Sequence, residues 1–271
     1  MKDIKRLAII AGNGKFPIIL AKTAISSGIE TVVIAIKSEA DCVIEDFVDN
    51  VFWIELGEAK KLINILQNEK IEYAIMAGKV TKTTLFKNSL KLDKEARTVL
   101  SRVMDKKDDT LLAAVASRLK DFNVELLDST TFMKNLMPEK GVLTSRKPNS
   151  RQKEDIAFGF KIAKELGRLD IGQSVVVKDK AVMSLEAIEG TDLAIKRGGK
   201  LGGEGVVVVK VAKPNQDMRF DVPVIGLETI ESLKAVKASA LAIEAGKVLV
   251  FEKEEVIRLA NDNNIVIVAV D

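Results

Sequence analysis

The stretch RLAIIAGNGKFPIILAKTAISSG, Arg6–Gly28, decides the fold of the first half of the chain. Arg6–Ile10 is a short apolar run, which predicts a buried strand. A glycine-rich loop at Gly12–Gly14 follows it, and Phe16–Ser27 then carries apolar residues at helical spacing. The stretch therefore predicts a strand, a loop and a helix, which together form the repeating unit of an α/β fold.

The same alternation of strands and helices continues through the first half of the chain. Strands are predicted at Thr31–Ile36, Val51–Glu55, Tyr73–Ala77 and Val124–Leu127, and helices at Glu58–Asn68 and Asp108–Phe122. This order predicts a mainly parallel sheet with right-handed crossovers. We therefore interpret residues 1–137 as a Rossmann-like nucleotide-binding domain.

The periodicity disappears in PEKGVLTSRKPNS, residues 138–150, where turn-forming residues gather. We interpret this stretch as a linker and residues 151–271 as an α+β domain. Its predicted helices are Gln152–Leu166, Thr191–Arg197 and Glu254–Asn261, and its predicted strands are Val175–Val177, Ala181–Leu185, Val206–Val211, Lys247–Phe251 and Ile265–Val270. The stretch GGKLGGEG, residues 198–205, is expected to be mobile or sharply turned.

The composition excludes several classes of protein. Of the 271 residues, 47% are hydrophobic and 30% are charged, as expected of a soluble globular protein. The net charge of +3 argues against a nucleic-acid binder but leaves room for peripheral contact with an anionic membrane. No apolar run approaches the roughly 18 residues of a membrane helix, and the first residues do not resemble a signal peptide, so we expect a cytoplasmic location.

The chain contains no histidine and a single cysteine, Cys42. Catalytic triads that use histidine, histidine-ligated metal sites and thiolate zinc clusters are therefore excluded. Any catalysis must depend on carboxylates, lysines, arginines and backbone amides, with or without a hard metal ion.

Three fragments in the second half carry acidic residues on turn-rich sequence, and the first two of them place carboxylates beside glycine. They are GRLDIGQ at Gly167–Gln173, LEAIEGTD at Leu185–Asp192 and KPNQDMRFDVPVIG at Lys213–Gly226. Their acidic candidates are Asp170, Glu186, Glu189, Asp192, Asp217 and Asp221. Each acid alone is more often a surface or capping residue than a catalytic one. Mixed charge on irregular backbone nevertheless suits a phosphorylated ligand and a metal ion, so the clustering favours a function for some of them.

These fragments, in this order, resemble the LpxI-type UDP-2,3-diacylglucosamine pyrophosphatases of lipid A biosynthesis. The resemblance runs nearly end to end and is strongest over Arg151–Asp271. The R-x-D-x-P segment of that family, whose aspartate is essential to activity, stands here as Arg219, Asp221 and Pro223. The resemblance implies hydrolysis of UDP-2,3-diacylglucosamine to UMP and 2,3-diacylglucosamine 1-phosphate, called lipid X, with a divalent cation such as Mg²⁺.

The resemblance also directs the assignment of roles in the second half, and it implies that residues 151–271 are the catalytic and lipid-binding domain. Asp221 is assigned as catalytic, either as a metal ligand or as a carboxylate that orients the attacking water, and Arg219 as a phosphate partner. Asp192 joins them in the catalytic group. The predicted metal ligands are Asp170, Glu186 and Asp221, and the predicted substrate-binding residues of this half are Gln173, Thr191 and Lys213.

The loop AGNGKFP of the first half matches neither nucleotide-binding fingerprint. Pro17 stands where a dinucleotide motif needs its third glycine, and the spacing of a P-loop is absent. Flexible backbone before a helix N-terminus nevertheless exposes amides that attract phosphate. We therefore predict that Gly12, Asn13 and Gly14 bind the substrate, with a tight turn that binds no ligand as the alternative.

A second group of candidates follows the predicted strand Tyr73–Ala77. Lys79 and Thr81 are expected near the glycine loop, because ligands of open α/β sheets lie at the carboxyl ends of strands. Lys79 is assigned to the substrate diphosphate, although a solvated loop lysine is the simpler interpretation. Asp108 and Asp109 are interpreted first as helix-capping residues and second as a metal-side pair.

Two other classes of protein stay open. The first half alone fits a protein that binds a sugar nucleotide or another nucleotide without hydrolysis, because a sheet with a glycine loop specifies no reaction. A nicotinamide-dependent oxidoreductase is disfavoured by Pro17 and by Lys37–Ser38 after the second strand, where Glu39 is the only acid within reach. For the hydrolase, we expect the first domain to position the nucleotide and the second to supply Asp221, with acyl chains in a cleft between the domains.

Overall fold

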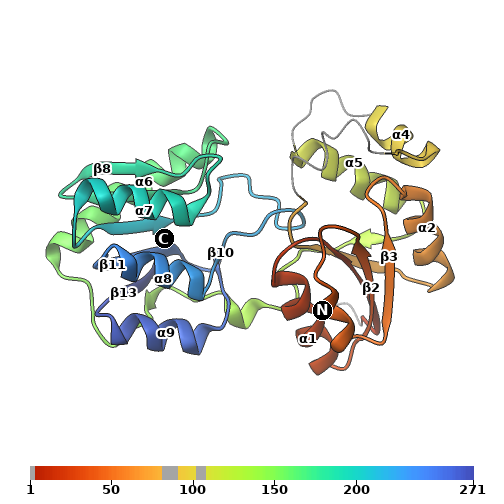
Figure 1. The fold of residues 1–271 in the computed structure, drawn as a ribbon, viewed down its shortest axis with the longest axis horizontal. Coiled ribbons are helices and arrows are strands. Elements are labelled where there is room, and N and C mark those ends of the chain that lie inside the picture. Colours follow the sequence, from red (N-terminus) through yellow and green to blue (C-terminus); the bar gives the residue numbers. More distant parts are fainter. Residues whose placement is uncertain (1–3, 81–90, 102–107) are drawn as a thin grey trace. The chain divides into compact units, whose positions relative to one another are not determined.

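The structure is a computed structural model that describes residues 4–80, 91–101 and 108–271. Contacts divide the chain into two compact units (Figure 1). Unit 1 comprises Met1–Met133 together with Asp217–Phe220, and unit 2 comprises Lys134–Gln216 together with Asp221–Asp271. Four residues of the third acidic fragment therefore belong to unit 1, whereas their neighbours on both sides belong to unit 2.

Unit 1 contains a five-stranded sheet in the order β3-β2-β1-β4-β5, in which every strand pair is parallel. Its strands are β1 (Arg6–Ala11), β2 (Glu30–Ile36), β3 (Asn50–Ile54), β4 (Tyr73–Ala77) and β5 (Glu125–Leu126). Its described helices are α1 (Phe16–Ser26), α2 (Ala59–Asn68), α4 (Lys94–Ser101), α5 (Asp108–Lys120) and the short 3-10 helix η1 (Cys42–Asp46). The predicted Rossmann-like sheet is confirmed.

Apolar periodicity explains these elements. β1 from Leu7 onward and β2 from Thr31 onward are buried throughout, as expected of central strands that are covered on both faces. α2 packs one apolar stripe, which includes Leu62 and Leu66, into the same core as the strands. The first half of the chain therefore folds as its local sequence predicts.

Unit 2 contains a six-stranded mixed sheet in the order β6-β13-β11-β9-β7-β8. Its strands are β6 (Gly141–Val142), β7 (Ser174–Lys178), β8 (Ala181–Leu185), β9 (Val207–Lys210), β11 (Ala240–Glu244) and β13 (Val266–Val270), and β10 (Val224–Ile225) pairs separately with β12 (Leu249–Val250). Its helices are η2 (Lys134–Leu136), α6 (Ser150–Arg168), α7 (Thr191–Gly202), α8 (Leu227–Ala235) and α9 (Lys253–Asp262). The α+β prediction for this half is confirmed.

The two faces of this sheet are covered by different helices. Val207 and Val209 of β9 pack with Ile156 of α6, whereas Val208 packs with Ile230 of α8. Since successive side chains of a strand point to opposite faces, α6 covers one face and α7, α8 and α9 cover the other. Within the described ranges, no helix combines the length and the apolar character needed to cross a bilayer.

Residues 138–150, predicted as a linker, contribute to the sheet of unit 2. Gly141 and Val142 form β6, which pairs antiparallel with β13 at the sheet edge. The Thr144 hydroxyl accepts a hydrogen bond from the amide of Ile267 at 3.0 Å. A strand of two residues is too short for an alternating pattern, so the sequence could not reveal it.

The turn predicted at GGKLGGEG is wrong over Gly198–Gly202, because α7 continues through these glycines. A side chain at Gly198 would overlap with Val176 of β7, and one at Gly199 would overlap with Val236 after α8. The glycines therefore permit close packing of α7 on its neighbours rather than a change of chain direction. Their effect lies in tertiary structure, which the local sequence does not show.

Candidate functional site

A chain of hydrogen bonds runs along the sheet edge of unit 2 where β9 ends and β7 begins. Lys210, the last residue of β9, is buried, and its Nζ donates to Thr191 Oγ1 and to the Val224 carbonyl oxygen, both at 2.9 Å. The Thr191 hydroxyl donates to Glu186 Oε1 at 2.9 Å, and the backbone N–H of Gln173 donates to Glu186 Oε2 at 3.4 Å. This Lys210 network (Gln173, Glu186, Thr191 and Lys210) links all three acidic fragments, because Val224 belongs to the third.

Two buried acceptor atoms of the predicted site lack a hydrogen-bond partner within the described chain. They are Gln173 Oε1 and Asp192 Oδ1. Asp192 lies in the first turn of α7, where the helix dipole favours a carboxylate. A buried oxygen without a donor is costly, so each of these atoms is suited to accept a hydrogen bond from a bound molecule.

Asp170 and Lys213 form an ion pair with each other. Asp170 Oδ1 lies 2.6 Å from Lys213 Nζ, and the Asp170 side chain is 58% exposed. Asp170 also adopts a left-handed backbone conformation, with φ 57°, directly after the C-cap of α6. The pair therefore joins the first acidic fragment to the third, with charges that offset one another.

The R-x-D-x-P segment is divided between the two units. Arg219 belongs to unit 1, where its Nε and Nη2 donate to the Asp217 carboxylate at 2.9 and 2.7 Å and its guanidinium lies over the Phe220 ring. These hydrogen bonds lower the pKa of Asp217 and raise the pKa of Arg219. The guanidinium that the sequence assigns to phosphate is thus already paired with a carboxylate.

Asp221 belongs to unit 2, is partly exposed, and is held by Gln216. Gln216 Nε2 donates to the Asp221 carbonyl oxygen at 2.7 Å and to Asp221 Oδ2 at 3.3 Å. The carboxylate therefore has a defined neighbour that is a neutral donor. Gln216 is a site residue that the sequence pattern did not identify.

The predicted metal ligands Asp170, Glu186 and Asp221 do not form one ligand set. Their carboxylates are held by three different partners, which are Lys213, Thr191 and Gln216 respectively. Within the part of the chain that the structure describes, no three acidic, histidine or cysteine side chains gather closely enough to hold a metal ion. The three carboxylates therefore do not make a protein-only magnesium site.

In unit 1 the glycine loop and the loop after β4 lie side by side, as the sequence predicts. Asn13 and Lys79 exchange backbone hydrogen bonds of 2.7 and 2.9 Å, and the Gly12 amide donates to Ala77 at 2.8 Å. The amides of Gly12 and Asn13 are therefore engaged within the protein, which corrects the expectation that they point at a phosphate. Gly14, exposed with φ 99°, leads into the N-terminus of α1 and stays available for that role.

Gly78→Ala is expected to destabilise the protein more than Gly14→Ala. Both glycines have positive φ, 87° and 99°, so both substitutions strain the backbone. Only at Gly78 would the new Cβ also lie 2.6 Å from the Asn13 carbonyl oxygen, whereas nothing lies within 4 Å at Gly14. Thermal denaturation of both variants should show an additional loss of about 1–3 kcal/mol for Gly78→Ala. Equal losses would contradict the close approach of the two loops.

Two predictions fall on parts of the chain that lie outside the described residues. Thr81 is one of them. The side chains of Asp108 and Asp109 are also outside the description, although α5 does begin at Asp108.

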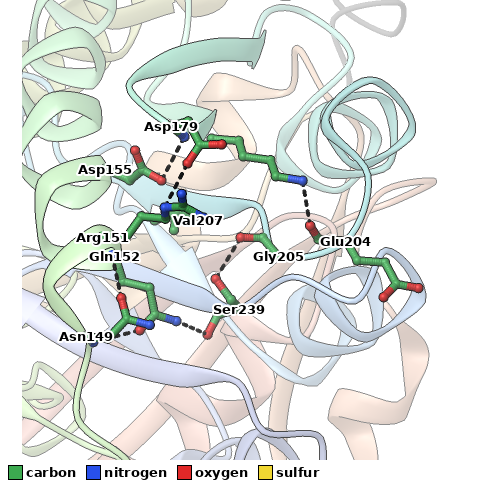
Figure 2. A pocket seen from close by; sticks show the side chains of 10 residues that line it. Asn149, Arg151, Gln152, Asp155, Asp179, Glu204, Gly205, Val207 and Ser239 are labelled. Carbon is green, nitrogen blue, oxygen red and sulfur yellow. Dashed lines mark hydrogen bonds and ion pairs between the residues drawn. The ribbon is translucent and has the colours of Figure 1, made fainter.

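A polar pocket of about 330 Å³ lies at the other end of the unit 2 strands, beside the N-terminus of α6 (Figure 2). It contains none of the predicted site residues. Its charged side chains have partners within the protein: Asp155 accepts from the backbone amides of Asp179 and Lys180, Arg151 pairs with Asp179, and Lys178 Nζ donates to the Glu204 backbone carbonyl. We interpret these contacts as structural.

The sequence did not identify Lys210 and Gln216 as site residues, and there is a physical reason in each case. Lys210 lies within the apolar run Val206–Val211, so it was included in a central strand without a role of its own. Gln216 is an uncharged residue in a loop whose charged residues attracted the interpretation. A lysine at the buried end of a strand is uncommon unless it is paired, and this was the available signal.

The comparison with curated proteins gives one clear relative. The chain is 29% identical over 279 aligned positions to UDP-2,3-diacylglucosamine pyrophosphatase LpxI of Caulobacter vibrioides, with 99% of this chain and 98% of the relative covered. Among solved structures, the biotin carboxylase subunit of pyruvate carboxylase matches at 13% identity and a TM-score of 0.28, covering 64% of this chain and 34% of that one. Glycinamide-RNase-transformylase T from Mycobacterium tuberculosis matches at 11% identity and a TM-score of 0.25, covering 68% and 44%. We draw no conclusion about this chain from structural similarity this low.

Family models cover almost the whole chain. The LpxI N-terminal domain matches residues 6–136, and the LpxI C-terminal domain matches residues 139–268. The three acidic fragments and the Lys210 network all lie within the second match. The chain therefore belongs to the LpxI family.

Proposed function

We propose that this protein hydrolyses the pyrophosphate bond of UDP-2,3-diacylglucosamine to give UMP and 2,3-diacylglucosamine 1-phosphate in lipid A biosynthesis. The observation that carries the proposal is membership of the LpxI family along both domains, together with a relative of that name that aligns over 99% of the chain. The chemistry is compatible with a chain that lacks histidine, because cleavage of a phosphoanhydride depends on positioning and charge neutralisation more than on a covalent nucleophile.

In this proposal Asp221 is the principal catalytic residue. Its carboxylate orients the attacking water or holds a cation beside the diphosphate, and its contact with Gln216 fixes its direction. Asp192 is assigned to the same reaction, since its buried Oδ1 can accept a hydrogen bond from substrate or water. Arg219 is assigned to the substrate phosphates, which would compete with Asp217 for the guanidinium.

The remaining assignments concern substrate binding. Gln173 and Thr191 belong to the Lys210 network, and Lys213 is placed beside it by the ion pair with Asp170. In unit 1, the α1 N-terminus after Gly14 and the neighbouring Lys79 are assigned to the nucleotide.

Magnesium enters this proposal with the substrate rather than through a protein-only site. Mg²⁺ is commonly bound by one or two carboxylates together with substrate phosphates, so a set of three protein ligands is not required. None of the roles assigned to the residues of this chain depends on an ion held by the protein alone.

Incubation of the purified protein with UDP-2,3-diacylglucosamine and Mg²⁺ tests the function. Release of UMP in amounts well above the enzyme concentration is expected. Stoichiometric binding of the substrate without UMP release would instead support a non-hydrolytic carrier of sugar nucleotides and would contradict the proposal.

We also propose that unit 2 makes peripheral contact with the cytoplasmic face of the inner membrane, where a lipid-linked substrate resides. Ile188, just before α7, is 94% exposed, Leu193 in the first turn of α7 is 55% exposed, and Leu201 at its end is 66% exposed. The exposed Lys196 and Lys200 lie between the two leucines on the same side of the helix. Exposed leucines with neighbouring cations are typical of helices that bind anionic membrane surfaces.

Sedimentation with lipid vesicles tests this surface. The double variant Leu193→Ser, Leu201→Ser is expected to bind anionic vesicles more weakly than the wild type, because buried apolar area provides part of the binding free energy. Ile25→Ser, which removes a 42% exposed isoleucine from α1 in unit 1, serves as the control. Equal binding by the wild type and the double variant would remove the assignment of α7.

A further inference from the structure

The loop that carries Asp221 leaves unit 2 and returns to it within a few residues. Gln216 is the last residue before the departure and Asp221 is the first after the return, while Asp217–Phe220 belong to unit 1. Gln216 Nε2 donates to the Asp221 carbonyl oxygen and to Asp221 Oδ2, and Gln216 Oε1 accepts from the Lys213 amide at 3.1 Å. The Gln216 side chain therefore connects the point where the loop leaves unit 2 with the point where it returns. We call these residues (Lys213, Gln216 and Asp221) the loop neck.

The segment that precedes the loop neck is held in place by the ion pair of Lys164 and Glu244. The Ala212 amide donates to Glu244 Oε2 at 2.8 Å, and the Ala212 carbonyl accepts from Lys164 Nζ at 2.9 Å. Lys164 Nζ also lies 3.0 Å from the Glu244 carboxylate, whose side chain is 7% exposed. Both polar groups of Ala212 are thereby satisfied by a paired acid and base, so the start of the loop has a defined position.

The segment that follows the loop neck, up to Val224, is held in place by Lys210. The Lys210 Nζ donates to the Val224 carbonyl, three residues after Asp221, and the adjacent Pro223 carbonyl accepts from the Leu249 amide at 2.9 Å. Pro223 is buried and has a restricted φ, which limits the freedom of the segment between Asp221 and Val224. Since Lys210 also donates to Thr191, the same ammonium group connects this segment with the Lys210 network.

We propose that Gln216 and Lys210 are positioning residues for the Asp221 carboxylate. Gln216 holds the carboxylate directly, and Lys210 holds the backbone that carries it. The inference rests on the proposed function, in which Asp221 contacts the reacting diphosphate or its water. Catalysis requires such a group to be placed within a fraction of an ångström, and a displacement of about 1 Å can cost about a hundredfold in rate.

Gln216→Glu tests the direct contact with almost no change of shape. Glutamate keeps an oxygen that can accept from the Lys213 amide, but it replaces the Nε2 donor with an oxygen that repels the acceptors of Asp221. Gln152→Glu is a matched control in the same unit, because Gln152 likewise accepts from one amide, that of Asn149, and donates from Nε2 to one carbonyl, that of Ser239. The control lies beside the pocket of Figure 2 and belongs to no proposed site.

Lys210→Met tests the support of the backbone. Lys178→Met is its matched control, because Lys178 Nζ also donates to carbonyl oxygens, those of Gly202 and Glu204, at the opposite end of the strands. Each variant removes the hydrogen bonds that a lysine of the same sheet donates to nearby oxygen atoms, so a general loss of stability should affect both. Only Lys210 is linked to the segment that carries Asp221.

Steady-state kinetics and the melting temperature are measured for the four variants and for Asp221→Ala. We expect Gln216→Glu to lower kcat by about ten- to a hundredfold while KM changes by less than about threefold, with a melting temperature like that of Gln152→Glu. Lys210→Met should lower kcat much more than Lys178→Met does. A near-normal kcat for Gln216→Glu beside an inactive Asp221→Ala would overturn this inference alone. A fully active Asp221→Ala would overturn the catalytic assignment and this inference together.

Discussion

Asp221→Ala is expected to remove turnover of UDP-2,3-diacylglucosamine, with a fall in kcat of about a hundredfold or more, and to leave the fold intact. The loss follows because no histidine can replace a carboxylate that orients water or a cation. The fold should survive because the side chain is only partly buried and its recorded partner is the neutral amide of Gln216. UMP release and thermal denaturation measure the two properties separately.

Asp262→Ala is the control for this prediction. Asp262 is the exposed last residue of α9 in unit 2, and its removal deletes the same charge from the same unit. Turnover close to that of the wild type is expected for this control. An Asp221→Ala enzyme that kept comparable activity would show that another group performs the assigned role.

Glu244→Ala is expected to cause the largest loss of stability, about 3–5 kcal/mol, because it leaves the partly buried Lys164 ammonium group and the buried Ala212 amide without their acceptor. Glu244 is 6% exposed and accepts from Lys164, Lys247 and the Ala212 amide. Glu255→Ala serves as the control, since Glu255 is exposed and pairs with the exposed Arg258, and such pairs contribute about 0–1 kcal/mol. Chemical denaturation of both variants gives the two free energies of unfolding, and similar losses would contradict the argument.

The same carboxylate predicts a pH dependence of stability. Burial alone would raise the pKa of Glu244, but hydrogen bonds from Lys247, Lys164 and the Ala212 amide outweigh burial and hold the pKa below its ordinary value of 4.5. The folded state therefore binds this proton less readily than the unfolded state does. The stabilisation is complete above about pH 4.5 and is lost as the pH falls through the folded pKa. The difference in stability between wild type and Glu244→Gln should shrink over that range.

Local patterns predicted much of the fold. The succession of β1, the glycine loop and α1 was visible because each piece has its own periodicity or punctuation within about ten residues. The parallel order of the unit 1 sheet then followed from repeated strand–helix alternation. Elements of unit 2 with clear amphipathic pattern, such as α6, were also predicted from sequence.

Tertiary contacts hid the rest. α8 and β11 were not predicted, because the stretch Leu227–Glu244 mixes apolar and helix-forming residues and contains no glycine or proline to mark a boundary between helix and strand. Gly198 and Gly199 suggested a turn, whereas their missing side chains make room for Val176 and Val236 from other elements. A residue whose identity depends on contact with a residue far along the chain leaves no pattern in the local sequence.

The candidate site, like the fold, was only partly predictable from the sequence. The sequence identified the fragments that contain Glu186, Thr191 and Asp221, but it did not show how they are held. Lys210 and Gln216 supply that connection through hydrogen bonds between residues that are distant along the chain or hidden within a loop. The glycines of the first loop were interpreted as phosphate-binding residues, although the backbone of Gly12 packs against the loop after β4.

Phosphorus NMR of the wild-type protein with UDP-2,3-diacylglucosamine and Mg²⁺, in water enriched with heavy oxygen, tests the central claim most directly. If the protein hydrolyses the phosphoanhydride, the diphosphate signals disappear, signals of UMP and of the sugar 1-phosphate grow equally, and one of the two products carries a single solvent oxygen. Diphosphate signals that persist while the substrate is bound in stoichiometric amounts would contradict the account.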